Sequence, residues 1–136
     1  MRISKQLAEC LGVIAGNGSI SWYQKNYDYK LQVCGNKTED VFYFEYLSEV
    51  FFQQFKIYPK MRFKEDWLYL DLQSKKVLEQ LITLGFKPGK KARTVRIPEY
   101  ILINNKLSCA FLRGLADTDF CITFKKKNNN YPCIKA

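Results

Sequence analysis

Two segments of the chain, 102 positions apart, carry the same succession of small, apolar and polar residues. Gly12 aligns with Gly114, Asn17 with Asp119 and Ile20 with Ile122. In both copies apolar residues at helical spacing lead to a polar residue, and the alternation typical of a strand follows. The repeat therefore predicts two equivalent helix-to-strand units within one chain.

Small residues recur four positions apart in each copy, as Gly12 and Gly16 in the first and as Gly114 and Thr118 in the second. Residues four apart lie on one face of a helix. Because small side chains let two backbones approach closely, we expect these faces to pack against each other. The alternative is that each glycine only ends or loosens its helix.

Hydrophobic periodicity predicts an α–β–β–α–β–β–α order and an α+β fold, followed by a short element and a further apolar segment. Ser4 and Ser74 are in position to cap the first and third helices, and Thr38-Glu39-Asp40 to begin the second. The predicted helices span residues 3–16, 38–55 and 74–84, the strands 19–23, 29–33, 60–64 and 67–72, and the later segments 98–103 and 107–116.

Composition narrows the classes of function. The 136 residues carry 22 Lys and Arg against 13 Asp and Glu, a net charge of +9, which favours a nucleic acid over a membrane as partner. No histidine is present, which excludes Ser-His-Asp triads and histidine-ligated zinc. Five cysteines without a CxxC pair indicate a reducing cytoplasm, and no apolar stretch is long enough for a membrane span.

Strand alternation also predicts which side chains leave the core. In the second strand pair Met61, Phe63 and Leu68 face a core, together with Leu70 and Leu72. The polar set on the opposite face can reach base edges and phosphates in a DNA major groove, although an ordinary solvated sheet face is the alternative. This set is Ser21, Tyr23, Lys30, Gln32, Lys60, Arg62, Lys64 and Tyr69.

Asp117 and Asp119 stand at the C-terminal end of the second repeated helix. Carboxylates there oppose the helix dipole, and a bound cation such as Mg²⁺ reverses that penalty. Two such ends side by side would suit the hydrolysis of phosphodiester bonds. The alternative is that these acids only solvate a turn.

The segment from Leu112 to Phe120 resembles the LAGLIDADG signature of homing endonucleases, and Cys10 to Gly18 resembles a divergent first copy of it. The flanks, Arg96 to Glu99 and Phe111 to Gly114, are similar to those of archaeal and intein-type members. The resemblance extends over essentially the whole chain.

The resemblance implies a homing-endonuclease-like αββαββα half over residues 1–104, with a curved antiparallel sheet that binds double-stranded DNA through the major groove. Residues 105–136 would form a partial second repeat, a helix with one or two strands packed on the first half in one compact domain. Asp119 and Asn17 would be the catalytic positions, and they would bind the metal together with Gly16 and Thr118. The metal would be Mg²⁺, for which Mn²⁺ is a substitute.

Three departures bear on activity. Asn17 brings no negative charge, Phe120 replaces the final glycine of the motif, and the second half is short. The chain is therefore either a truncated or degenerate member, or two copies form a homodimer that completes the DNA surface. The expected function is a site-specific DNA endonuclease of a mobile element. The alternatives are a catalytically degenerate DNA- or RNA-binding module, such as a regulator or a maturase-like protein, and an inert remnant.

Overall fold

The computed structural model of the protein describes residues 2–89, 97–119, 121–126 and 130–135, with side chains described as far as Asp117. The first helix is α1 (Lys5–Asn17). Its N-terminus is capped as predicted, because the backbone N–H of Leu7 donates to Oγ of Ser4 at 3.0 Å. The chain continues through β1 (Gly18–Tyr23), a 3-10 turn (Gln24–Asn26) and β2 (Asp28–Asn36).

The second helix, α2 (Val41–Phe55), begins later than predicted. The interpretation of Thr38-Glu39-Asp40 as its capped first turn is wrong. Oδ1 of Asn36 accepts the backbone N–H groups of Thr38 and Glu39, at 2.8 and 3.1 Å, and the Asp40 carboxylate accepts the N–H of Asn36 at 2.6 Å. These bonds close a turn over residues 36–40, which delays the helix to Val41.

A strand pair and a third helix follow: β3 (Lys60–Lys64), β4 (Trp67–Gln73) and α3 (Lys75–Thr83). The predicted cap is confirmed, since Oγ of Ser74 accepts the backbone N–H of Val77 at 3.3 Å. Gly85 follows the helix with φ of +104°, the left-handed conformation that glycine adopts most readily after a helix end.

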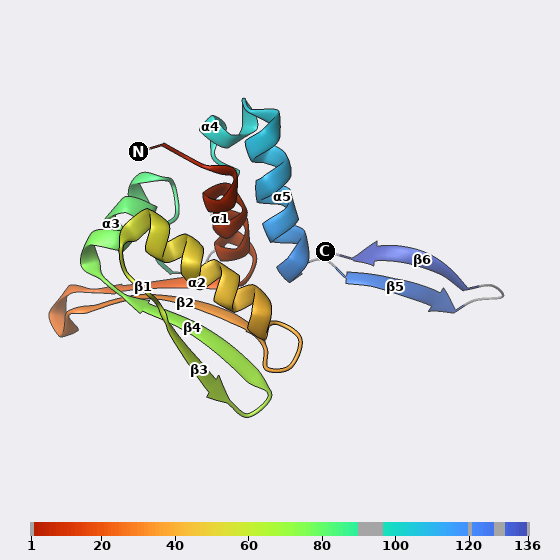
Figure 1. Cartoon of the computed structure of the whole chain (residues 1–136), viewed down its shortest axis with the longest axis horizontal. Helices are drawn as coiled ribbons and strands as arrows, with labels where there is room; N and C mark the ends of the chain where they lie inside the picture. The colour runs from red at the N-terminus through yellow and green to blue at the C-terminus, as the bar shows by residue number, and fades with distance from the viewer. Residues whose placement is uncertain (1, 90–96, 120, 127–129, 136) are drawn as a thin grey trace.

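The four strands form one antiparallel sheet in the order β1-β2-β4-β3. Figure 1 shows the helices on one side of this sheet, while the other side is left open. The buried face of the sheet carries the inward half of the strand alternation, as predicted, and packs against apolar residues of the helices. Its buried residues are Ile20, Leu31, Val33, Leu68, Leu70 and Leu72.

One predicted core position is wrong. Phe63 is 51% exposed, and Met61 is only partly buried. Both residues lie on β3, an edge strand, and Figure 1 shows the β3–β4 turn extending away from the helices. Phe63 therefore points to the apolar side of the sheet at a place that no helix covers.

The rest of the chain contains α4 (Glu99–Leu102), α5 (Asn105–Asp119), β5 (Cys121–Lys126) and β6 (Asn130–Lys135). β5 and β6 pair with each other as a separate antiparallel sheet. The predicted α+β class is confirmed, and α4, α5 and the strand pair β5–β6 follow the first α–β–β–α–β–β–α series. No helix in the described part of the chain is long and apolar enough to cross a membrane.

Candidate functional site

The two helices of the repeat touch backbone to backbone at their glycines. A Cβ added at Gly12 would collide with the carbonyl oxygen of Phe111 and lie 2.9 Å from the backbone nitrogen of Leu115. A Cβ added at Gly114 would collide with the carbonyl oxygen of Glu9 and lie 3.0 Å from the nitrogen of Val13. Only glycine fits at either position with the helices this close. Gly12 and Gly114 therefore lie where the backbones of α1 and α5 come closest to each other.

The contact between α1 and α5 is reciprocal. Each glycine meets the residue three before the other glycine and the residue one after it, so the two helices are related by an approximate twofold arrangement. Asn17 and Asp119 each stand five residues beyond their glycine and each end their helix, about 7.5 Å further along at 1.5 Å per residue. Figure 1 shows both helices running toward the sheet. The structure thus brings the two helix ends to the same level.

The side chain of Asn17 is partly buried and already engaged. Its Nδ2 donates to the backbone carbonyl of Cys34 in β2, at 3.2 Å. This bond fixes the amide orientation, because a carbonyl can only accept. It ties the end of α1 to the sheet, and the Oδ1 of Asn17 takes no part in this bond.

The donor types at this junction are hard oxygens, which suit a divalent ion such as Mg²⁺. Asn17 Oδ1 is neutral, and helix C-termini add carbonyl oxygens with partial negative charge. At the predicted site a full negative charge would come from Asp119, whose side chain, like those of Thr118 and Phe120, lies outside the described residues. Within the side chains that are described, no group of three acidic or cysteine residues could hold a metal. The ligand roles of Asp119, Asn17, Gly16 and Thr118 remain predictions.

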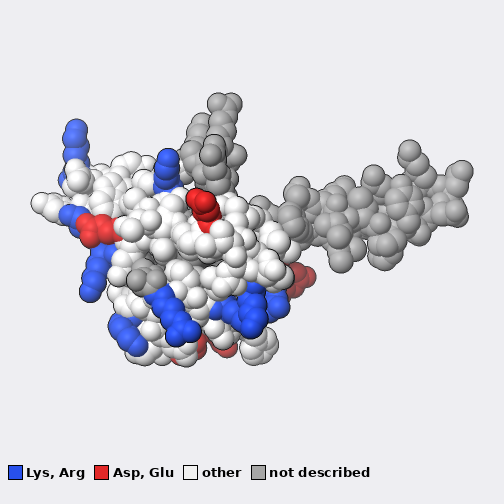
Figure 2. Space-filling view, turned by 90° about the horizontal axis from the view of Figure 1, so that it is seen from above, with Lys and Arg blue, Asp and Glu red and all other residues white. Residues whose placement is uncertain are grey.

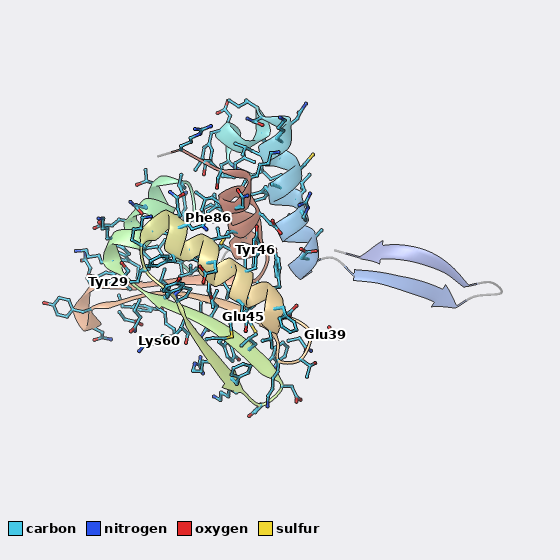
Figure 3. The ribbon with its side chains drawn as sticks, in the orientation of Figure 1. Tyr29, Glu39, Glu45, Tyr46, Lys60 and Phe86 are labelled. Carbon is cyan, nitrogen blue, oxygen red and sulfur yellow. The ribbon has the colours of Figure 1, made fainter. Side chains whose placement is uncertain are left out.

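The open side of the sheet carries the predicted polar set. Strand register pairs members of this set across neighbouring strands: Ser21 is the partner of Lys30, and Arg62 is the partner of Tyr69. None of the eight residues is buried. Figure 3 shows Lys60 on the side of the sheet away from the helices, whereas Phe86 lies among them. The register assigns this common face to Ser21, Tyr23, Lys30, Gln32, Lys60, Arg62, Lys64 and Tyr69.

The opposite, helix-covered side of the molecule is seen in Figure 2. There the Lys and Arg side chains stand mostly around the edge, with acidic side chains and uncharged surface between them. Lys60, Arg62 and Lys64, by contrast, follow one another on one face of β3, with Lys30 on the same side two strands away. The open sheet face therefore holds a compact basic group that a polyanion can contact.

An acid lies within this basic group. Asp71 stands between Gln32 and Lys60 in register, and its side chain is only 16% exposed. Its oxygens accept from Nε2 of Gln32 and from Nε of Arg62, both at 3.0 Å, and Lys30 Nζ is 3.8 Å away. Strand alternation places Asp71 on this face, but sequence reasoning did not identify it as a site residue.

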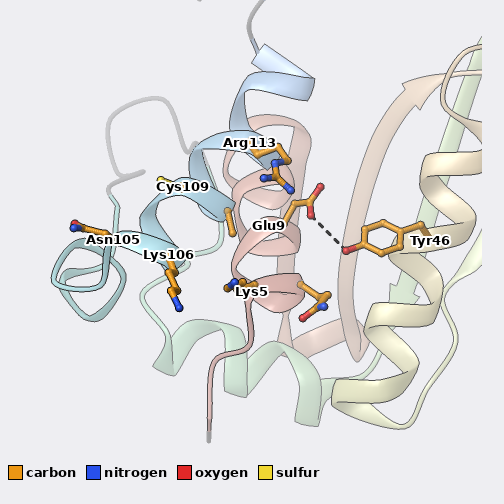
Figure 4. Close-up of a pocket in the computed structure, with 9 residues that line it drawn as sticks. Lys5, Glu9, Tyr46, Asn105, Lys106, Cys109 and Arg113 are labelled. Atoms are coloured by element: carbon orange, nitrogen blue, oxygen red, sulfur yellow. Dashed lines mark hydrogen bonds between the residues drawn. The ribbon is translucent and has the colours of Figure 1, made fainter.

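A second polar feature joins α1 to α2. The buried Glu9 accepts hydrogen bonds from the hydroxyls of Tyr43, at 2.8 Å, and Tyr46, at 3.4 Å. Burial, and then the Glu9 carboxylate, raise the pKa of Tyr43, so its hydroxyl stays a donor. Glu9 lines a recess of about 400 Å³. Figure 4 shows Lys5, Lys106 and Arg113 around it. This recess lies in the N-terminal halves of α1 and α5, away from their paired ends.

No protein-family model and no curated protein matches the sequence. Solved structures do match the fold. I-DmoI in complex with DNA and Mn has a TM-score of 0.62 with 18% identity, over 88% of this chain and 64% of that one. I-DmoI in complex with DNA and Ca gives 0.61 and 16%, over 86% and 58%. A point mutant of I-SmaMI gives 0.52 and 15%, over 97% and 66%.

I-DmoI is described as a homing endonuclease, and at these identities the similarity shows a shared fold. The chain spans about three fifths of the length of the I-DmoI structures that it matches. The fold is thus that of homing endonuclease structures, an α+β arrangement built on a four-stranded antiparallel sheet.

Proposed function

We propose that the protein is a site-specific DNA endonuclease of the homing type that depends on a divalent metal. The single observation that carries the proposal is the reciprocal contact of α1 and α5, which brings two helix ends together beside an open, basic sheet face. The bond from Asn17 to the Cys34 carbonyl ties one of these ends to the sheet itself. Similar folds are found in structures of I-DmoI with its target DNA, which supports the same partner here.

Double-stranded DNA is the partner that the open face fits best. A two-stranded ribbon enters a major groove about 12 Å wide, where Arg, Lys and Gln side chains reach base edges. Lys60, Arg62 and Lys64 would otherwise repel one another along β3, and phosphates relieve that repulsion. The other members of the predicted set would contact the remaining phosphates and bases.

The metal would be held by Asp119 and the Oδ1 of Asn17, with the backbone oxygens of Gly16 and Thr118 nearby. When bound, Mg²⁺ polarises a phosphoryl oxygen, activates water and stabilises the leaving oxygen. The residues of the chain position the ion and the scissile phosphate. Asn17 contributes an oriented oxygen and no charge, so we expect Asp119 to dominate affinity for the ion. Mn²⁺, which also takes oxygen ligands, is the expected substitute.

The test is a cleavage selection. Purified protein is incubated with a randomised duplex library and Mg²⁺, and wild type is compared with Asp119→Asn. Wild type should enrich cut ends at one sequence, and EDTA should abolish cutting. Asp119→Asn should bind that sequence without cutting it. Equal cutting by both proteins, or cutting that persists in EDTA, would contradict the mechanism, and the absence of any duplex binding would contradict the partner.

A second candidate function is a binding module without catalysis, whose target is DNA or an intron RNA. The neutral, hydrogen-bonded Asn17 favours it, because one of the two expected acidic ligands is absent. This candidate predicts specific binding that Mg²⁺ does not convert into cleavage. Assembly as a homodimer, with residues 1–104 and 105–136 as a first half and a partial second repeat, remains a prediction.

A further inference from the structure

Asp71 is the least expected residue of the open sheet face. An acid among cations on a DNA-binding surface repels phosphate, so its presence costs general affinity for DNA. Asp28, the first residue of β2, lies on the same face of the sheet. The two acids differ in their surroundings, since Asp71 is held by three neighbouring side chains and no described residue donates to the carboxylate of Asp28.

Arg62 is fixed by two contacts. Its Nε donates to Oδ2 of Asp71 at 3.0 Å, and its guanidinium stands 4.5 Å over the ring of Tyr69. The bond through Nε uses neither terminal amino group. Those two groups form the edge that donates to O6 and N7 of guanine. These two contacts therefore fix the plane of the Arg62 guanidinium and leave its two terminal amino groups in position to donate to a guanine.

Gln32 is fixed from the opposite side. Its Nε2 donates to Oδ1 of Asp71 at 3.0 Å, and the amide can have only this orientation because an ionised carboxylate only accepts. The bond uses one of the two N–H groups. One N–H and Oε1 are left as a donor and acceptor pair, which is the pattern that reads N7 and N6 of adenine.

The sheet order sets the spacing of these two side chains. Gln32 lies on β2 and Arg62 on β3, with Asp71 on β4 between them. Neighbouring strands are about 4.8 Å apart, so two strand spacings give roughly 10 Å across the sheet. The side-chain ends lie closer together than this, because both bond to the carboxylate of Asp71. At 3.4 Å per base step, roughly 10 Å is an upper limit of about three base pairs.

We propose that Asp71 is a positioning residue that sets base specificity. It holds Arg62 in place to read a guanine and Gln32 in place to read an adenine. The two bases lie at most about three base pairs apart. This inference rests on the proposed role of the sheet face as a DNA surface. It assigns Asp71 opposite effects on two measurable quantities. Its charge lowers affinity for any duplex, and its hydrogen bonds raise discrimination between duplexes.

The experiment is a binding selection from a randomised duplex library in EDTA, which prevents cleavage. The proteins are wild type, Asp71→Ala, Arg62→Ala, Gln32→Ala and the matched control Asp28→Ala. Wild type should select a site with a strong guanine and a strong adenine. Arg62→Ala should lose the guanine preference and Gln32→Ala the adenine preference, each by roughly 5- to 150-fold.

Asp71→Ala should weaken both preferences together and bind unrelated duplexes more tightly at low salt. Asp28→Ala removes the same charge from the same face, so it should also bind unrelated duplexes more tightly but keep the selected site. Asp71→Asn keeps the side-chain shape and only one acceptor oxygen, so at least one preference should decline. Circular dichroism confirms that each variant is folded.

The outcomes separate the two proposals. If wild type selects a site and Asp71→Ala selects the same site with the same preferences, Asp71 acts only as a charge and the inference is overturned. A site without the guanine and adenine also overturns it, while DNA binding stands. If wild type binds no duplex, the proposed function fails and takes the inference with it.

Discussion

Asn17 ends α1 with a side chain that has two possible uses, one structural and one chemical. Its Nδ2 donates to the Cys34 carbonyl at 3.2 Å, which joins helix and sheet. Its Oδ1 is the oxygen that a metal ion would use. The residue therefore combines a structural bond with an uncharged oxygen at the predicted ligand position, where the family resemblance implies an acid.

The substitution Asn17→Asp separates these uses. Without metal, a carboxylate would face the Cys34 carbonyl, two acceptors against each other at a helix C-terminus, so we expect a loss of about 1–3 kcal/mol in the free energy of unfolding. Added Mg²⁺ binds the folded carboxylate and should restore stability by mass action. Thermal unfolding with and without Mg²⁺ measures both effects.

Asn17→Ala is the control, because it loses the same hydrogen bond without gaining a charge. It should be destabilised and should show no added response to Mg²⁺. An Asn17→Asp protein that Mg²⁺ stabilises no more than wild type would place the metal site elsewhere.

At the level of whole elements, the proposed site requires that α1 and α5 meet through glycine. The substitution Gly12→Ala inserts a methyl group against the carbonyl of Phe111 and near the backbone of Leu115. Backbone cannot move aside as a flexible side chain does, so we expect destabilisation of about 3 kcal/mol or more, despite the better helix propensity of alanine. Urea unfolding measures the loss.

The control for this change is Cys109→Ala, at an exposed position of α5. It should alter stability by about 0.5 kcal/mol or less. If Gly12→Ala were as mild as this control, the close approach of the two helices would be disproved.

The elements themselves could be predicted from the sequence because their signals are local. Helical and strand periodicities gave the order of elements, the caps at Ser4 and Ser74, and the polar face of the sheet. The two glycine patterns indicated a helix pair, since small residues on one face have few other uses. The error at Phe63 arose because periodicity shows which side a residue faces but not whether a helix covers that side.

Contacts between distant segments could not be predicted in the same way. The partners of Asp71 come from β2 and β3, which lie on either side of β4 in the sheet. Gln32 and Asp71 are 39 positions apart, and only the register of β2 against β4 joins them. The bond from Asn17 to Cys34 likewise depends on the pairing of β1 with β2. Such contacts follow from register, which a single sequence does not display.

For the molecule as a whole, the net charge of +9 matters less than its placement. If the open sheet face binds DNA, the double substitution Lys60→Ala and Lys64→Ala should remove up to two phosphate contacts. The slope of log K against log salt concentration should then fall in magnitude by up to about 0.9 per lysine. Duplex binding measured across a salt series gives this slope.

A matched control removes the same charge from the other side. Lys5 and Lys106 line the recess between α1 and α5 (Figure 4), so Lys5→Ala with Lys106→Ala should leave the slope nearly unchanged. An equal change for both pairs would show that DNA is attracted to the overall charge and not to the sheet face.

The most direct test of the central claim is where a metal binds in the DNA complex. Mn²⁺ broadens the NMR signals of nearby amides, so titration of the isotope-labelled protein with its selected duplex bound locates the ion. We predict broadening at Gly16, Gly18 and the final residues of α5, little effect at Leu7 near the start of α1, and loss of the effect in Asp119→Asn. Broadening centred on the Glu9 recess, or a pattern that Asp119→Asn leaves unchanged, would contradict a metal site at the paired helix ends.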